Sequence, residues 1–176
     1  MNKIKGLTAR IGRLREERGA TDPILVVAAM AVTLVLLVGG SFLISGIITN
    51  GQNLNAKSDL DKITVAEAAS FAQGDRYLAY NVTAAGDETG SPLLSESSVG
   101  FNATEGGSIN VVLEGGRGWN AASESVSGAI YLKTSENNKI VEYQDADGVQ
   151  TPLSAADIDK LELTQAEADA LIGGLN

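Results

Sequence analysis

The feature that most constrains this chain is a stretch without any charged residue, from Pro23 to Ala56. Within it, residues 24–48 are almost entirely apolar, and as an α-helix these 25 residues would span roughly 37 Å at about 1.5 Å per residue. That length exceeds the hydrocarbon core of a bilayer, which is about 30 Å thick. A buried core helix is the alternative, but a helix that is apolar on every face needs a larger protein around it. We therefore predict a transmembrane segment over 24–48.

The charges on the two sides of this segment differ in sign. Residues 1–19 hold six basic residues against Glu16 and Glu17, a net charge of +4, so the rest of the chain carries −13. A basic stub before an apolar run is typical of a single-pass protein whose N-terminus stays in the cytoplasm. The acidic body argues against binding of nucleic acid, because it would repel phosphates.

Neither cysteine nor histidine occurs among the 176 residues. Their absence excludes disulfides, thiolate nucleophiles, cysteine- or histidine-ligated zinc and histidine-based proton transfer. Since no catalytic constellation is found in the sequence, we expect a protein that is not an enzyme and that has no cofactor.

The apolar segment could also belong to an ordinary cleaved secretory signal. Such a signal has an apolar region of about 7–15 residues that ends in a small-x-small cleavage site. Here the run is longer, and the polar residues 49–52 after it contain no convincing A-x-A pattern. A segment that stays attached to the mature chain is the better interpretation.

The junction before the apolar run reads RGATDPI over residues 18–24. It resembles the leader of type IV prepilins, a short basic peptide that ends in glycine just before the apolar helix. The resemblance implies that prepilin peptidase cuts between Gly19 and Ala20 and removes the basic leader, residues 1–19. Glycine suits such a site because a protease binds extended backbone, which a residue without Cβ adopts freely.

Two positions after this junction depart from the bacterial family. Ile24 stands where the family usually has a glutamate that meets the N-terminal amine of a neighbouring subunit, and Ala20 stands where it usually has phenylalanine. Asp22 is the nearby carboxylate that could replace the glutamate in assembly, or it could only cap the helix. Pro23 is well suited to the first turn of a helix.

The apolar segment is followed by a stretch with the pattern of an amphipathic helix. Leu60, Ile63, Ala66 or Glu67, and Phe71 recur at helical spacing, with Val65 and residues 68–69 on the same broad side. Lys57 with Asp61, and Asp59 with Lys62, are spaced for ion pairs on a helix surface. Gln73, Gly74 and Asp75 predict the end of the helix and a turn. We therefore expect one long helix over 20–75.

This amphipathic stretch is similar to the segment AKSD…AEEAYFADNG.Y that follows the membrane helix in pilins and pseudopilins. Here the matching residues read AKSDL over 56–60, AEAA over 66–69 and FAQGDRY over 71–77. Gly39 and Gly40, with Gly46 and Gly51, interrupt the apolar helix. The resemblance implies that they allow local extension in a filament, while close packing of helices in the bilayer explains them equally well.

The region 76–150 predicts a small antiparallel head. Residues 82–98 have the composition of a loop, and strands are expected over 108–113, 127–134 and 139–144, with a hairpin turn at 136–138 and a stop at 145–148. We expect a sheet of three or four strands packed on the second half of the long helix, an α+β fold. The predicted core residues are Val112, Trp119, Ile130, Leu132, Ile140 and Tyr143.

The last residues, 151–176, predict two short helices. One begins at Ser154, and the other begins with the capping-box pattern of Thr164 and Glu167 and ends at Gly173 and Gly174. Whether this tail packs on the sheet or stays loose is left open by the pattern.

Weaker motifs are present in the head. Residues 118–143 are loosely similar to the sheet of pilins from Gram-positive bacteria. Asp145 and Asp147 match part of a calcium loop but are more typical of a plain acidic turn. Asn81 and Asn102 match the acceptor pattern for N-glycosylation, a common triplet.

The resemblance as a whole implies a pilin, the structural subunit of an extracellular type IV pilus-like filament. Its precursor is expected in the cytoplasmic membrane, where prepilin peptidase and the assembly machinery, an inner platform and an ATPase, act on it. Asp22, Pro23, Gly39 and Gly40 are the residues expected to take part in assembly, and many copies of the chain form the filament. Two alternatives stay open, a single-pass surface protein with an acidic ligand-binding head and a pseudopilin of a secretion or DNA-uptake system.

Overall fold

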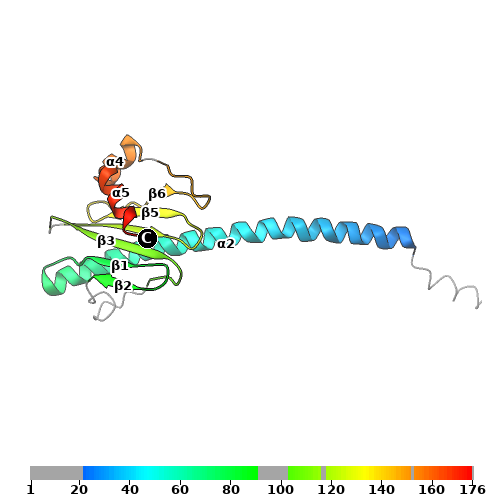
Figure 1. Ribbon diagram of the computed structural model, residues 1–176, viewed down its shortest axis with the longest axis horizontal. Helices are drawn as coiled ribbons and strands as arrows, with labels where there is room; N and C mark the ends of the chain where they lie inside the picture. The colour runs from blue at the N-terminus through cyan, green and yellow to red at the C-terminus, as the bar shows by residue number, and fades with distance from the viewer. Residues whose placement is uncertain (1–21, 91–102, 116–117, 152, 176) are drawn as a thin grey trace, which may run out of the picture. The chain divides into compact units, whose positions relative to one another are not determined.

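The computed structural model describes residues 22–90, 103–115, 118–151 and 153–175 (Figure 1). The chain divides into two compact units, Met1–Gly46 and Ile47–Asn176. The first contains the apolar half of the long helix, and the second, the head, contains the rest of that helix and all the strands that the structure describes. The predicted cleavage site, Gly19 and Ala20, lies outside the described residues.

The long helix, α2, spans Pro23–Gly74 and has 52 residues. It is helical through Gly39, Gly40, Gly46 and Gly51, so the single chain has no extended break at these glycines. Its end is defined by Asp75, whose φ of 52° lies in the left-handed region that stops a helix. The predicted long helix and its end are thus confirmed, although the described helix begins at Pro23 rather than at Ala20.

Six strands form one antiparallel sheet with the order β2-β1-β3-β4-β5-β6. The strands are β1 Tyr80–Val82, β2 Glu88–Gly90, β3 Ser108–Glu114, β4 Gly118–Glu124, β5 Ile130–Thr134 and β6 Val141–Gln144. Consecutive strands lie side by side in the sheet except β2 and β3, which are separated by β1, and β3 to β6 form a simple meander.

Both faces of the sheet are covered by helices, as Figure 1 shows for α2 on one side and α4 and α5 on the other. Because successive side chains of a strand point to opposite faces, one set packs on α2 and the alternate set on the tail. The α2 side contains Leu60 and Ile63 with Trp119 and Tyr131 of the sheet. The tail side contains Leu132 with residues of α4 and α5. β4 and β5 are consequently buried along almost their whole length.

The tail helices are α4, Ala155–Leu161, and α5, Gln165–Gly173, and both begin as predicted. Ser154 and Thr164 are their N-caps, and each accepts a hydrogen bond from the backbone N–H three residues later in a reciprocal capping box. Leu161 and Leu171 are almost completely buried against the sheet. The tail therefore packs, which answers the question that the sequence pattern left open.

Several expectations for the head are wrong. The sheet has six strands rather than three or four, and the region expected to be a loop from residue 82 contains the end of β1 and all of β2. The strand expected over 127–134 begins only at Ile130, because Ser127 and Gly128 form a turn. β4 was not expected at all, although its Trp119 was placed in the core, where the structure has it.

The predicted core is only partly confirmed. Trp119, Ile130, Leu132 and Tyr143 are buried. Val112 is 45% exposed, because α5 does not cover the end of β3 completely. Ile140 is half-buried and packs against the edge of the cluster on the α2 side.

Candidate assembly interface

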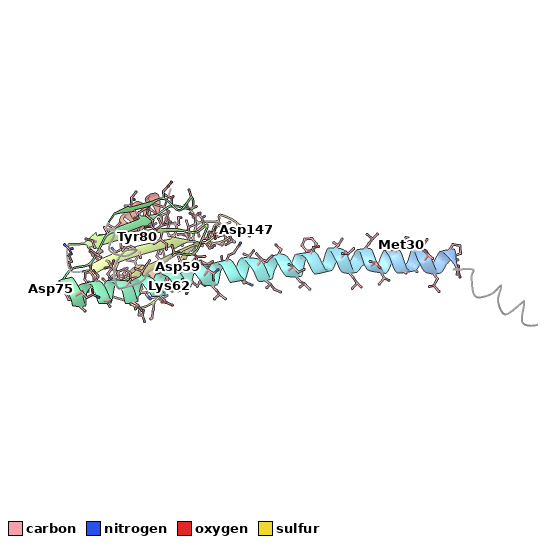
Figure 2. All side chains as sticks on the ribbon, turned by 90° about the horizontal axis from the view of Figure 1, so that it is seen from below. Met30, Asp59, Lys62, Asp75, Tyr80 and Asp147 are labelled. Atoms are coloured by element: carbon pink, nitrogen blue, oxygen red, sulfur yellow. The ribbon has the colours of Figure 1, made fainter. Side chains whose placement is uncertain are left out.

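The apolar half of α2 has no partner among the described residues. Its large side chains, apart from the half-buried Val26, are exposed, from 77% for Ile24 to 54% for Ile48, and Figure 2 shows side chains projecting to both sides of the ribbon near Met30. α2 is long and apolar enough to cross a membrane by length and composition, a test that a signal sequence near the N-terminus would also pass. A surface of this size stays out of water only in lipid or against another apolar surface.

The start of this helix is built by Asp22 and Pro23. The backbone N–H of Ile24 donates to Asp22 Oδ1 at 3.0 Å, and the Asp22 carbonyl accepts from Leu25 and Val26 at 2.9 and 3.1 Å. Pro23 is the first helical residue, where its missing N–H costs nothing. The capping interpretation of Asp22 is therefore confirmed, while its contact with a neighbouring subunit's amine stays a prediction.

The polar side chains inside the apolar segment bond within their own helix. Thr33 Oγ1 donates to the Ala29 carbonyl and Ser41 Oγ to the Leu37 carbonyl, both at 2.8 Å. Satisfied in this way, the hydroxyls add little to the cost of surrounding the helix with hydrocarbon.

Gly39 and Gly40 lie in regular helix, and a Cβ built on either would meet nothing within 4 Å. Neither glycine is thus required by the fold of a single chain. Their role as close-approach points for a neighbouring helix stays a prediction.

In the head, charged side chains of α2 form contacts with the sheet and with the segment that precedes β3. Asp59 is 2% exposed, forms an ion pair with Lys62 at 2.6 Å and accepts a hydrogen bond from the Thr104 backbone N–H at 2.8 Å. Figure 2 shows Asp59 and Lys62 where α2 runs beside the sheet. The predicted Asp59–Lys62 pair is confirmed, and its tie to the segment before β3 was not foreseen.

The second predicted pair, Lys57 with Asp61, is replaced by contacts with β5. Lys133 is 1% exposed on β5, and its Nζ lies 2.6 Å from Asp61 Oδ1. Lys57 instead places its ammonium group 4.5 Å from the ring centroid of Tyr131, in cation–π geometry. No local spacing rule signals these contacts, because their partners lie more than seventy residues apart in the chain.

Glu67 is the most perturbed carboxyl group at this contact. It is fully buried on α2, its Oε2 accepts from the Leu78 backbone N–H at 3.0 Å, and its Oε1 has no partner among the described residues. Burial raises the pKa of Glu67 to about 7, and the hydrogen bond from Leu78 offsets part of that rise. The helical spacing predicted that either Ala66 or Glu67 lies on the packed side of the helix, and both are buried.

The head also has a shallow groove of about 460 Å³ between the end of β3 and α5. Its apolar lining comes from Val112, Leu113, Ala170 and Leu171, and its acidic groups are Glu114 and Glu167. The carboxylate of Glu167 is already used by its capping box, where it accepts from the Thr164 backbone N–H at 2.9 Å.

The weaker motifs have local structural roles. Asp145 Oδ1 accepts from the backbone N–H groups of Asp147 and Val149 at 3.0 and 2.9 Å, which makes it part of its own turn. In the part of the chain that the structure describes, no group of three or more acidic residues could hold a metal ion. Asn81 Nδ2 donates to Asn110 Oδ1 and to the Gly174 carbonyl, so this amide is not free for a glycan.

Asn102, the other acceptor pattern, lies outside the described residues.

Comparison of the chain with protein-family models, with curated proteins and with solved structures finds no match. The α+β arrangement of a long N-terminal helix on a six-stranded antiparallel sheet therefore stands on the structure alone.

Proposed function

We propose that this protein is the structural subunit of an extracellular type IV pilus-like filament. The observation that carries the proposal is the apolar half of α2, on which the large side chains from Ile24 to Ile48, apart from the half-buried Val26, are exposed. Lipid would cover this surface in the precursor, and the same segments of other copies would cover it in the filament. The basic residues 1–19 and the glycine before Ala20 support removal of a leader by prepilin peptidase.

The physical logic of assembly is an exchange of lipid for protein around a helix without charges. A charged side chain at the centre of such a segment would cost about 2.5–3.5 kcal/mol in the membrane. Residues 24–48 contain none, and Thr33 and Ser41 bond to their own helix. The segment can therefore enter lipid as a precursor and leave it again when an assembly ATPase and its platform add the subunit to the filament.

Substitution of Gly19 tests the processing step. We expect Gly19→Val to block cleavage, because a β-branched side chain would stand at the residue that the peptidase must bind in extended form. Gly12→Val, in the same leader but away from the junction, is the matched control and should mature normally. Intact mass and N-terminal sequence of the purified chain report the cut, and electron microscopy reports filaments. Shortened protein and filaments from Gly19→Val would show that the leader assignment is wrong.

The same measurements separate the proposal from a single-pass surface protein with a ligand-binding head. That alternative predicts an untrimmed N-terminus and monomers, with the groove between β3 and α5 as its binding site. A pseudopilin would share every processing step with a pilin and differ in making few or no long filaments.

A further inference from the structure

The groove between β3 and α5 lies where the tail stops covering the sheet. The last row of side chains that the tail covers runs across β3, β4 and β5 as Asn110, Ala122 and Leu132. The next row on the same face consists of Val112, Asn120 and Thr134. Val112 and Asn120 line the groove together with Ala170 and Leu171 of α5. The groove is thus built on a row of the sheet that α5 leaves partly uncovered.

The polar side chains of this second row are buried without hydrogen bonds. Asn120 is 8% exposed and Thr134 is 3% exposed, and neither Asn120 Oδ1 nor Thr134 Oγ1 has a partner among the described residues. A buried acceptor without a donor destabilises a fold. Because Asn120 lines the groove, rotation about its Cβ–Cγ bond turns the amide oxygen toward a donor placed there. An amide at this position therefore suits a ligand better than it suits the fold.

Both ionisable residues that line the described part of the groove are acidic. Glu114, at the end of β3, is exposed and forms no ion pair with the described residues. Hydrogen bonds from Thr164 lower the pKa of Glu167, so this carboxylate keeps its charge. The groove therefore offers acceptors and negative charge, and it selects a ligand whose polar end is cationic and carries hydrogen-bond donors.

The positions of the two acceptors on the sheet restrict the ligand further. Val112 lies opposite Asn120, and Glu114 follows Val112 by two residues on the same face. Glu114 and Asn120 are consequently diagonal neighbours, whose side chains start about 7–8 Å apart. A cation with N–H donors on two of its sides can bridge them through two hydrogen bonds of about 2.9 Å each.

We propose that the groove binds an arginine side chain from a segment of another protein. A guanidinium group is planar, always charged and carries five N–H donors in a fork, so one group can donate to Asn120 Oδ1 and to the Glu114 carboxylate together. Its methylene stem packs on the apolar lining, Val112, Leu113 and Leu171. A lysine ammonium supplies the charge without the fork.

The shape of the groove favours a protein segment over a free small molecule. Small-molecule pockets enclose about 70–90% of their ligand. Here Val112 and Leu113 remain 45% and 39% exposed, so the groove can cover one side chain but leaves the rest of its ligand outside. The net charge of −13 after residue 19 also attracts cationic segments from a distance. A filament subunit can carry such a site as well as a single-pass protein can, so the inference goes beyond the proposed function.

Peptide binding to the full chain in detergent tests the inference. The probes are fluorescently labelled pentapeptides GVRVG, GVKVG and GVQVG, followed by fluorescence anisotropy. We expect GVRVG to bind at least about fivefold more tightly than GVKVG, and GVQVG to bind most weakly, because each lost hydrogen bond or charge weakens binding by about that factor. Glu114→Gln should weaken binding of GVRVG by at least about fivefold, whereas Glu136→Gln, at an exposed position in the β5–β6 turn, should leave it unchanged.

Asn120→Leu separates a role in binding from a role in the fold. Leucine is of similar size and removes an amide that has no partner, so the variant should unfold at the same or a higher denaturant concentration, as followed by Trp119, the only tryptophan. The same variant should lose the preference for GVRVG over GVKVG. An unchanged preference in Asn120→Leu would overturn the contact between the guanidinium and this amide.

Other results would overturn the inference as a whole. One is no binding of GVRVG at millimolar concentration, and another is an equal loss from Glu114→Gln and Glu136→Gln, since binding would then follow net charge alone. Self-association of the chain that Glu114→Gln abolishes would show that a second copy occupies the groove instead. None of these results concerns the leader or the apolar half of α2, so the proposed function is tested separately by the Gly19→Val experiment.

Discussion

From the raised pKa of the buried Glu67 carboxyl group, we predict that the head of this protein loses stability as the pH rises through neutrality. The side chain is fully buried between α2 and the segment that leads into β1, and it has only the Leu78 N–H as a hydrogen-bond partner in the described chain. Its pKa is raised from 4.5 to about 7. The protonated carboxyl group is thus the form that the fold prefers.

The sign of the pH dependence follows from proton counting. Between pH 4.5 and 7 the folded state holds a proton on Glu67 that the unfolded state has released, so the free energy of unfolding falls as the pH rises. Below pH 4.5 both states are protonated and the effect vanishes. The difference between the two pKa values corresponds to a loss of about 3 kcal/mol in the free energy of unfolding, complete above pH 7, and most of this loss falls between pH 5 and pH 8.

Glu67→Gln should remove this dependence, because the amide stays neutral while its Oε1 can still accept from the Leu78 N–H. The assay is denaturant unfolding of the full chain in detergent at several pH values, followed by Trp119 fluorescence. We expect the free energy of unfolding of the variant to rise relative to that of the unaltered protein by about 2–3 kcal/mol between pH 5 and pH 8. Glu136→Gln, at an exposed position in the β5–β6 turn, is the control and should gain nothing. An equal free-energy difference between Glu67→Gln and the unaltered protein at pH 5 and pH 8 would refute the reasoning.

Two further predictions use the same unfolding assay. Gly174→Ala should cost about 1–3 kcal/mol, because a Cβ there would collide with Asn110 Nδ2, which already donates to the Leu171 carbonyl at 2.7 Å. The neighbouring Gly173→Ala, with nothing within 4 Å of its Cβ, should instead stabilise by up to about 1 kcal/mol, and equal effects of the two changes would contradict this. Asp61→Asn should cost about 1–3 kcal/mol because it leaves the Lys133 ammonium buried without a counter-charge, whereas Lys133→Met should stay within about 1 kcal/mol of the unaltered protein. A larger loss from Lys133→Met than from Asp61→Asn would show that the charge pair itself is stabilising.

The parts of the fold that could be predicted are those with strong local signals. A long charge-free run and a 3.6-residue period define α2, and the capping boxes at Ser154 and Thr164 define the starts of α4 and α5. These signals depend on neighbours a few residues apart and need no knowledge of the tertiary structure.

The parts that could not be predicted are decided by distant segments. β4 has the sequence GWNAASE, whose small and polar residues give little strand signal, and it is a strand because β3 and β5 pair with it on both sides. Val112 is exposed because α5 does not extend over the end of β3. The burial of Lys133 depends on a carboxylate of α2, seventy-two residues earlier in the chain.

The buried charges of the head suggest why α2 docks on the sheet in one register. Its apolar side repeats at helical spacing, so a shift by one turn, about 5.4 Å, would still place apolar residues against the sheet. That shift would separate Asp61 from Lys133, which leaves the Lys133 ammonium buried without a counter-charge, and would also break the hydrogen bond from the Thr104 N–H to Asp59. Because the apolar half of the same helix has no charges, no comparable term fixes its position against neighbouring helices. We therefore expect the sheet to hold one fixed position on α2, whereas the apolar segment has no charge that would fix its position in lipid or, in the proposed filament, against other copies.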